Sequence, residues 1–359
     1  MSTTIREFGS EFDWAANEPF VTTEHKPALL QTPVYYRSGR DALKEIARTN
    51  SPRYRRVLLP ALCCESMVSP FTMNGYEAVF YRLRADFTAD ADDIREKITD
   101  DTVLLYIRYF GIVPLTDEEL LSLTAVAPHA RLVEDRTHDL PIRRTEKAAV
   151  TPHYTMASIR KWLAIGDGGV LSTDFEVGRC EAEPQFAALR RTAMEQKSVF
   201  LATGDEAIKT QFRAGLAEAS ELLDVDPVPY AMTEASKVLL ESIDFDAIAQ
   251  KRQANARALK ALLTPLEKKG KLTFITDRPE NSTLYFPILV DDQGAVQQAA
   301  AKRGVFCPVI WPVPAEAKGV CPVAEMAADR MLGVPCDQRY SEEDMAYIAD
   351  VLTAAIGEG

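Results

Sequence analysis

Short apolar runs alternate with amphipathic segments between residues 38 and 135. The segment 38–49, SGRDALKEIART, carries apolar residues at helical spacing and opens on a serine, a preferred helix cap. The runs with the length of buried strands are 55–60, 76–83, 102–111 and 130–135. We therefore expect an α/β fold with a large doubly wound, mostly parallel sheet that helices cover on both faces.

The segments between these runs and beyond them favour helices. Helical patterns occur at 65–75, 88–98 and 116–126, and the chain from 184 to 245 is mostly helical. In 88–98 the acidic residues come first and the basic residues late, as the helix dipole prefers. A further long helical pattern begins near Thr233 and closes at a glycine.

The C-terminal part predicts a second, smaller α/β unit. It has helical patterns at 295–304 and from Ser341 onward, and apolar runs at 271–276, 283–290, 305–311 and 331–336. The first 30 or so residues show no periodicity and predict an arm that lies on another surface. We therefore expect an N-terminal arm (1–32), a large domain (33–245) and a small C-terminal domain (246–359).

Composition and charge exclude several classes of protein. The 359 residues carry a net charge of -12, which disfavours a nucleic-acid partner. No basic segment followed by an apolar run opens the chain, and no stretch approaches the roughly 20 apolar residues of a membrane span. The six cysteines form no CxxC pair and no zinc-type spacing with the four histidines. We expect a cytoplasmic protein that binds neither nucleic acid, nor membrane, nor metal.

The start of the first predicted helix is a candidate anion site. Ligands of open α/β sheets bind outside the carboxyl ends of the strands. Ser38 and Gly39 begin the helix there, so that backbone N–H groups and a hydroxyl face outward, and Arg40 could add charge. A helix cap without a ligand would produce the same residues.

A carboxylate and a lysine follow in the same half of the chain. Asp135 comes directly after a buried strand, and His138 follows three residues later. The stretch ASIRKWLAIGDGG (157–169) places Ser158 one turn before Lys161 and then runs into glycines that allow a tight turn. A lysine amine is a useful nucleophile only when nearby positive charge or burial lowers its pKa, and Arg160 is one source of such charge. Each feature alone also fits a cap, an exposed basic pair or a turn.

Together these features are the parts that pyridoxal phosphate (PLP) needs. An anion cradle takes its phosphate, a carboxylate keeps its pyridine nitrogen protonated, and a lysine holds its aldehyde as an imine. The order of cradle, carboxylate and lysine on an alternating α/β chain therefore indicates a PLP site.

The sequence from about residue 33 to 355 resembles the DegT-type aminotransferases, a nucleotide-sugar aminotransferase family of the aspartate aminotransferase fold. The resemblance lies in the spacing from Asp135 to Lys161 and in the glycines that follow the lysine. The stretches that carry it are SGRDAL, VLLPALCCES, LLYIRYFG, VEDRTHD, SIRKWLAIGDGGVLSTD and LGVPCDQRYSEEDM.

The resemblance implies a role for each matching residue. Lys161 would be the Schiff-base lysine, Asp135 would pair with the pyridine nitrogen, and His138 would lie near the ring hydroxyl. The residues that would hold the phosphate are Ser38, Gly39, Arg40 and Ser158. The family also implies a homodimer with the active site at the subunit interface, which would suit the N-terminal arm.

The chain departs from the family at the ring-stacking position. The loop PALCCES has no aromatic residue where the family usually places one over the cofactor ring. Cys63, Cys64 or an aromatic residue from elsewhere would have to lie there. The helix that starts near YAMTEAS also lacks the asparagine-containing turn that reaches the partner's phosphate in the family.

We interpret the chain as a PLP-dependent aminotransferase that moves an amino group from an amino-acid donor to a carbonyl acceptor, with a keto-sugar nucleotide as one candidate. Arg339 could bind a substrate carboxylate or phosphate, although a surface ion pair would also explain it. The alternatives are a PLP-dependent dehydratase or another sugar-modifying PLP enzyme, and a PLP-fold ligand sensor without turnover. A metal- or nucleotide-dependent α/β enzyme would need a GxGxxG or Walker-type loop, and the sequence has neither.

Overall fold

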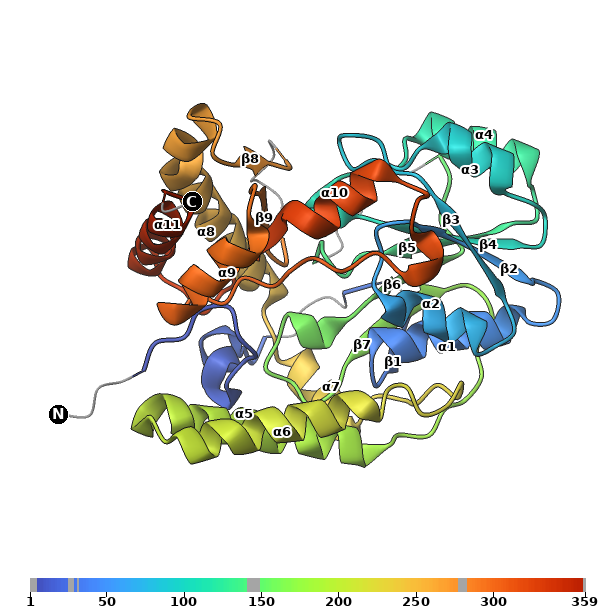
Figure 1. Ribbon diagram of the computed structural model, residues 1–359. Helices are drawn as coiled ribbons and strands as arrows, with labels where there is room; N and C mark the ends of the chain where they lie inside the picture. Colours follow the sequence, from blue (N-terminus) through green and yellow to red (C-terminus); the bar gives the residue numbers. More distant parts are fainter. Residues whose placement is uncertain (1–4, 25–28, 31, 141–148, 277–282, 358–359) are drawn as a thin grey trace.

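The structure is a computed structural model that describes residues 5–24, 29–30, 32–140, 149–276 and 283–357. Figure 1 shows a large sheet with its helices in one half of the molecule and a smaller sheet beside α8, α9 and α11 in the other half. The two sheets have seven and three strands.

The large sheet has the strand order β1-β7-β6-β5-β4-β2-β3. Its strands are β1 (Pro33–Tyr36), β2 (Arg56–Pro60), β3 (Glu77–Tyr81), β4 (Thr102–Ile107), β5 (Arg131–Asp135), β6 (Tyr154–Ala157) and β7 (Gly169–Thr173). Strands β3, β2, β4, β5 and β6 run parallel to one another, whereas β7 runs antiparallel to both β6 and β1. The prediction of a doubly wound, mostly parallel sheet is confirmed. β4 is buried at every position, which explains its nearly continuous apolar sequence.

The predicted helices of the first half form close to their expected bounds. They are α1 (Gly39–Asn50), α2 (Glu65–Thr72), α3 (Ala91–Lys97) and α4 (Asp117–Val126). Local capping fixes their starts: the Ser38 side chain accepts a hydrogen bond from the N–H of Asp41, and Thr116 and Glu119 form a reciprocal capping box. The antiparallel pair α5 (Pro184–Thr203) and α6 (Glu206–Glu221) supplies most of the helix predicted between 184 and 245.

The long helical pattern that begins near Thr233 is two helices, α7 (Glu234–Glu241) and α8 (Phe245–Lys268). The Asp244 side chain separates them because it accepts hydrogen bonds from the N–H groups of Asp246 and Ala247 and so starts a new helix. The apolar period continues across this break, which is why the sequence alone predicts one helix.

The C-terminal part contains a three-stranded antiparallel sheet of β8 (Thr273–Phe274), β9 (Phe286–Leu289) and β10 (Met331–Val334). Its helices are α9 (Gln293–Lys302), α10 (Pro322–Arg330) and α11 (Glu342–Gly357). The apolar run 305–311 forms only single bridges to Phe8 and Leu332, because Pro308 has no N–H with which to extend a ladder. In the described ranges no helix is long and apolar enough to cross a membrane.

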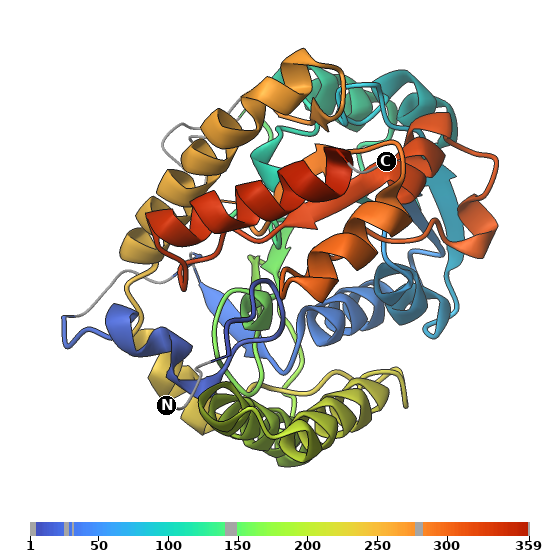
Figure 2. The ribbon, with the colours of Figure 1, turned by 60° about the vertical axis from the view of Figure 1, so that its left-hand side comes forward.

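The N-terminal arm lies on its own chain. Phe8 pairs with Val305 and its ring contacts Tyr340 and Tyr347, and the arm continues to Lys197 of α5. Figure 2 shows the arm (dark blue) passing between the C-terminal helices and the α5–α6 pair. A 3-10 helix, Trp14–Phe20, follows and packs on α5 and α8.

The apolar core is divided between the two sheets. One cluster fills the space around the large sheet, and a second joins α8, α9, α11 and the small sheet. The segment that contains Ile310, Ala317 and Ala324 returns to the first cluster although it lies late in the sequence. The division into an arm (1–32), a large domain (33–245) and a small domain (246–359) stays a prediction.

Candidate functional site

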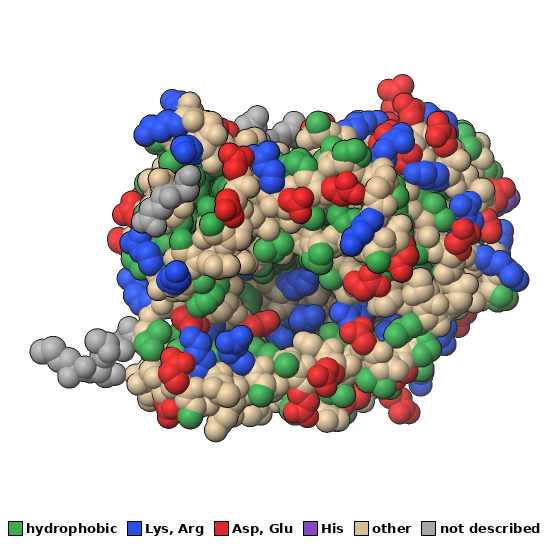
Figure 3. Space-filling model, viewed as in Figure 1, with side chains coloured by type: hydrophobic (Ala, Val, Ile, Leu, Met, Phe, Trp, Pro, Cys, Tyr) green, Lys and Arg blue, Asp and Glu red, His purple; other side chains and the backbone are tan. Residues whose placement is uncertain are grey.

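A cavity opens at the carboxyl ends of β4, β5 and β6, where Ile107, Asp135 and Ser158 line it. It encloses about 520 Å³ of space, its open mouth included. Figure 3 shows a hollow on this face of the molecule with Lys and Arg side chains inside it. The predicted site residues that line the cavity are Gly39, Arg40, Cys64, Asp135, His138, Ser158 and Lys161.

Two other predicted cofactor contacts do not line this cavity. The Ser38 hydroxyl donates a 2.6 Å hydrogen bond to Oδ2 of Asp41 and caps α1. Cys63 is fully buried in the core around the large sheet, and burial raises the pKa of its thiol. Both side chains therefore make contacts within the fold. Their neighbours Gly39 and Cys64 line the cavity instead.

The N-terminus of α1 forms one end of the cavity. Gly39 lies there, and a Cβ atom at this position would meet the Cβ of Ser158 at 3.0 Å. Gly169 lies close behind, where a Cβ would come within 2.3 Å of the backbone of Ser38. These glycines let the β7 backbone and the Ser158 turn approach the helix end, which brings the N-terminus of α1 to the cavity wall. Arg40 lines the same end and forms an ion pair with Asp224.

Asp135 is held at the end of β5, and its side chain is buried. Its Oδ1 accepts a 2.7 Å hydrogen bond from the N–H of Thr137. Burial raises the pKa of Asp135, whereas the Thr137 hydrogen bonds and the charge of Lys161 oppose that rise. Thr137 also accepts hydrogen bonds from the N–H of Ser158 and from Nε1 of Trp162, so the Asp135 loop is tied to the segment that carries the lysine.

Lys161 ends a single 3-10 turn, Ile159–Lys161, that follows β6. Its side chain lines the same cavity as Asp135 and is partly buried. Burial lowers the pKa of Lys161, the charge of Arg160 lowers it further, and Asp135 opposes both. The neutral amine, which is the form that reacts as a nucleophile or a base, is thereby favoured.

His138 lies in an aromatic group beside the cavity. Its ring centre is 4.7 Å from Phe110 and 5.2 Å from Trp311, and Trp311 also lines the cavity. Phe110 and Trp311 both have positive φ, at 50° and 45°, an uncommon conformation for aromatic residues that often marks a functional site. The buried Nδ1 of His138 has no hydrogen-bond partner within the described ranges.

The protonation of His138 gives a prediction about stability. Burial lowers its pKa to about 3, so the unfolded chain binds a proton below about pH 6.5 that the folded chain does not. Stability from this residue is therefore lost as the pH falls below 6.5. Between pH 7 and 5 we expect the wild type to lose about 2 kcal/mol more unfolding free energy than His138→Gln.

Urea titrations at the two pH values measure this difference. His129→Gln, at an exposed histidine, is the matched control and should keep the wild-type pH dependence. Equal losses in the wild type and in His138→Gln would mean that His138 is protonated in the folded protein.

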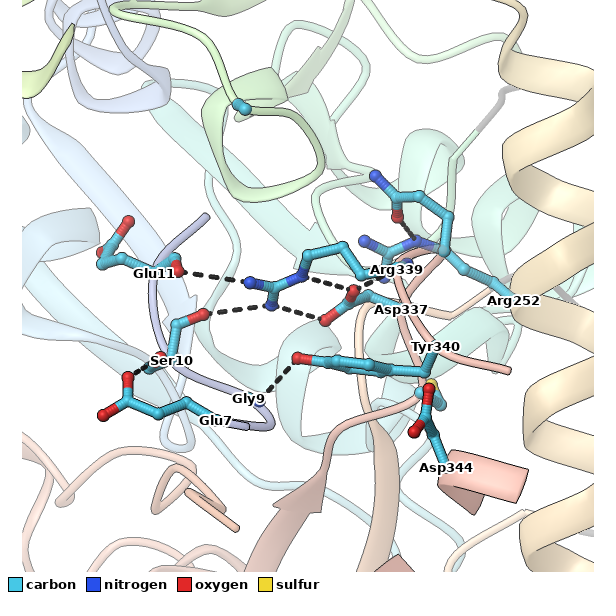
Figure 4. Close-up of polar contacts among 12 residues, drawn as sticks. Glu7, Gly9, Ser10, Glu11, Arg252, Asp337, Arg339, Tyr340 and Asp344 are labelled. Carbon is cyan, nitrogen blue, oxygen red and sulfur yellow. Dashed lines mark hydrogen bonds and ion pairs between the residues drawn. The ribbon is translucent and has the colours of Figure 1, made fainter. Parts of the chain in front are cut away.

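A second cavity of about 540 Å³ adjoins the first, and Arg160 and Lys161 line both. Arg339, the predicted substrate residue, lies in this second cavity. Its guanidinium donates two 2.8 Å hydrogen bonds to Asp337 and further bonds to the carbonyls of Ser10 and Glu11 on the arm. Figure 4 shows Arg339 between the arm and Asp337. In this structure Arg339 fastens the arm.

Sequence reasoning missed several residues of the two cavities. Trp311 lies in the segment 305–311, which gives no sign of proximity to Asp135, and the arm residues 9–12 have no periodic pattern. Arg160 appeared only as a source of charge beside Lys161, although it lines both cavities. For Trp311 the one usable signal was the missing aromatic residue in PALCCES, which demands a replacement from elsewhere.

The residues present fit PLP. The unpartnered Nδ1 of buried His138 awaits a polar group, the Gly39–Ser158 cradle beside the α1 N-terminus suits an anion, and a buried carboxylate faces the same space as a lysine of lowered pKa. Within the described ranges, no group of three or more His, Cys, Asp or Glu side chains could hold a metal ion. The arrangement can therefore bind a phosphorylated aldehyde and carry out amine chemistry on it.

Comparison with known proteins agrees with this chemistry. A sequence model of the DegT/DnrJ/EryC1/StrS aminotransferase family matches residues 42–353. No curated protein sequence matches the chain significantly.

Solved structures share the fold. A protein of Streptococcus pneumoniae, described as a sugar aminotransferase in its PLP form, has a TM-score of 0.68 at 16% identity, over 99% of each chain. PseC of Helicobacter pylori, an aminotransferase of pseudoaminic acid biosynthesis, has a TM-score of 0.65 at 13% identity, over 99% of this chain and 100% of its own. NtdA of Bacillus subtilis, with bound PMP, has a TM-score of 0.63 at 15% identity, over 99% of this chain and 87% of its own. At these identities the likeness concerns the fold.

Proposed function

The chain belongs to the DegT/DnrJ/EryC1/StrS aminotransferase family, and on that premise we propose that it is a PLP-dependent aminotransferase that uses the first cavity as its active site. It moves an amino group from an amino-acid donor to a carbonyl acceptor. The observation that carries the proposal is that Lys161, Asp135 and the N-terminus of α1 border one cavity.

Each side of the cavity would hold a different part of the cofactor. Gly39, Arg40 and Ser158 would bind the phosphate, Asp135 the ring nitrogen, and His138 the ring hydroxyl. When bound there, PLP supplies an aldehyde that captures the donor amine and a ring that withdraws electrons from the substrate's α-carbon.

The chain's own residues move and hold the protons. The Lys161 amine removes the proton from the α-carbon of the donor as a general base, and its lowered pKa favours the base form. Asp135 is buried and accepts a hydrogen bond from the N–H of Thr137. Its carboxylate would hold a proton on the ring nitrogen.

The acceptor is a keto-sugar nucleotide. The support is the family and the sugar-related descriptions of several proteins with the same fold. A lysine at position 161 favours transamination over dehydration, and neither the dehydratase nor the sensor alternative is favoured.

Absorbance spectroscopy tests the function. The purified protein mixed with PLP should absorb in the near-visible, and L-glutamate should convert that band into the shorter-wavelength band of pyridoxamine phosphate. A colourless protein that releases all PLP on dialysis would refute the cofactor. A stable band that no amino donor alters would refute transamination and support a ligand sensor.

Trp311 takes the place of the missing ring-stacking aromatic residue. Its indole lines the cavity, and Nζ of Lys161 is 6.0 Å from its ring centre. Because an aromatic contact contributes about 0.5–1.5 kcal/mol, Trp311→Ala should weaken PLP binding by about 2- to 10-fold. Trp311→Phe should bind nearly as well as the wild type. Equilibrium dialysis measures the dissociation constant, and an unchanged value in Trp311→Ala would exclude the contact.

The protein works as a homodimer with the active site near the subunit interface. The family supports this assembly, as does the surface beside α6, where Val225 and Val228 are 69% and 52% exposed. They follow Asp224, which pairs with Arg40 of the cavity, so a partner that covers these valines would lie next to the site. Light scattering should give about twice the monomer mass. The compartment is the cytoplasm, which suits six free thiols of which four are buried.

A further inference from the structure

The second cavity lies between the N-terminal arm and the segment that carries the lysine. Residues 9–12 of the arm form one wall, and Tyr285 and Arg339 lie on the wall that the C-terminal part contributes. Arg160 and Lys161 join it to the first cavity. A small molecule in the second cavity would therefore border on the Lys161 amine.

Three arginines line this cavity, and two of them already have partners. Arg339 bonds to Asp337 and to two carbonyls of the arm, as Figure 4 shows. Arg252 donates to Oε1 of Gln338 at 2.8 Å and to the carbonyls of Thr283 and Leu284. Both guanidinium groups therefore already take part in hydrogen bonds that join distant segments of the fold.

Arg160 differs from both. Its guanidinium makes no hydrogen bond or ion pair with any described residue, and its Nε atom is buried without a partner. Burial and the nearby charge of Arg190 lower the pKa of Arg160 to about 10. Arg160 and Arg190 also approach the same Phe186 ring, at 6.0 and 5.9 Å. A buried cation without a hydrogen-bond or ion-pair partner is costly in a folded protein and favours an anion.

We propose that Arg160 binds the carboxylate of the amino-acid donor in the second cavity, next to Lys161. This inference rests on the proposed aminotransferase function and deepens it. A guanidinium matches a carboxylate with two parallel hydrogen bonds. Because Arg160 and Lys161 border both cavities, a carboxylate held by Arg160 leaves the donor's amino group facing the space that Lys161 and Asp135 share.

Glu11 of the arm tunes this site. It lines the second cavity, and its Oε2 accepts a 3.2 Å hydrogen bond from Arg190. Its negative charge stabilises the positive charge of Arg160 and would repel an incoming carboxylate. Removal of this charge should therefore strengthen donor binding, a change of opposite sign to the removal of Arg160.

Calorimetric titration of the PLP-loaded protein with maleate, a dicarboxylate that cannot be transaminated, tests the site directly. Loss of a charged hydrogen-bond partner costs about 1.5–3 kcal/mol, so Arg160→Met should raise the dissociation constant of maleate about 10- to 100-fold. The KM for L-glutamate should rise by a similar factor. Arg160→Lys should restore part of the affinity, and Glu11→Gln should lower the dissociation constant by up to about fivefold.

Arg191→Met is the matched control. Arg191 lies on α5 next to Arg190, but its side chain is 56% exposed and pairs with Glu195, so its removal should leave maleate binding unchanged. Unchanged maleate affinity in Arg160→Met would overturn the proposal. If Arg160→Met does not fold, unchanged maleate affinity in both Arg160→Lys and Arg160→Gln would overturn it. Loss of the near-visible band in these variants would also overturn it and assign Arg160 to the cofactor phosphate. A wild type that never reacts with L-glutamate refutes the aminotransferase function instead.

Discussion

Lys161→Ala is expected to lower the rate of amino transfer from L-glutamate by about 10³- to 10⁴-fold, the upper part of the range for loss of one acid–base group. The alanine has no amine with which to hold the cofactor's aldehyde or to take the α-proton. The structure gives no obvious substitute, because Lys161 is the lysine that lines the cavity with Asp135 in the described part of the chain. Stopped-flow absorbance after mixing with L-glutamate measures the rate.

Borohydride reduction supplies a second readout that does not depend on turnover. It should attach the cofactor to a peptide that contains Lys161 in the wild type, and this labelled peptide should be missing in Lys161→Ala. Lys237→Ala, on α7 beside the exposed Glu234, is the matched control and should keep both the wild-type rate and the label. A labelled peptide from another part of the chain would mean that the wrong lysine has been assigned.

Asp135→Asn is expected to lower kcat by about 10²- to 10³-fold, as the loss of one preorganised electrostatic partner does elsewhere. An amide has the size of the carboxylate but no charge to keep a proton on the ring nitrogen. Folding should not suffer, because burial already raises the pKa of this carboxyl and the neutral amide avoids its desolvation.

The two effects of Asp135→Asn separate a functional role from a structural one. Thermal unfolding should show an equal or higher Tm, whereas kcat falls with little change in the KM for L-glutamate. Asp174→Asn, after β7, is a control outside the cavity and should change neither quantity. A lower Tm together with wild-type kcat would show that Asp135 serves the fold alone.

The strands β2 to β5 and the helices α1 to α4 could be predicted because their signals are local, whereas the short strands β1, β6 and β7 were not predicted. The fully apolar run of β4 and the capping of α1 at Ser38 and α4 at Thr116 need no knowledge of distant residues. The pattern failed where a local event interrupted it without disturbing the apolar period, as at the Asp244 cap between α7 and α8. It also failed at 305–311, where Pro308 prevents a ladder.

The candidate site divides in the same way. Asp135 and Ser158 lie at the carboxyl ends of the neighbouring parallel strands β5 and β6, Lys161 follows in the next turn, and the carboxyl ends of parallel strands meet at one edge of a sheet. Ser38 was predicted at the cofactor because it begins the first helix, and Cys63 because its loop lacks the ring-stacking aromatic residue. Which of two adjacent side chains faces a cavity depends on the packing behind them. Here the Ser38 hydroxyl bonds to Asp41, and Cys63 packs in the apolar core.

The sequence by itself determined the alternation of strands and helices as far as β5, the family and the spacing from Asp135 to Lys161, because spacing along the chain and local chemistry encode them. Only the tertiary structure decided that Trp311 lies beside His138, that Arg339 fastens the arm, and that Arg160 is left without a partner between two cavities. These outcomes depend on contacts between segments as far apart as Ser10 and Arg339. Such contacts are set by the packing of whole elements, which no local pattern records.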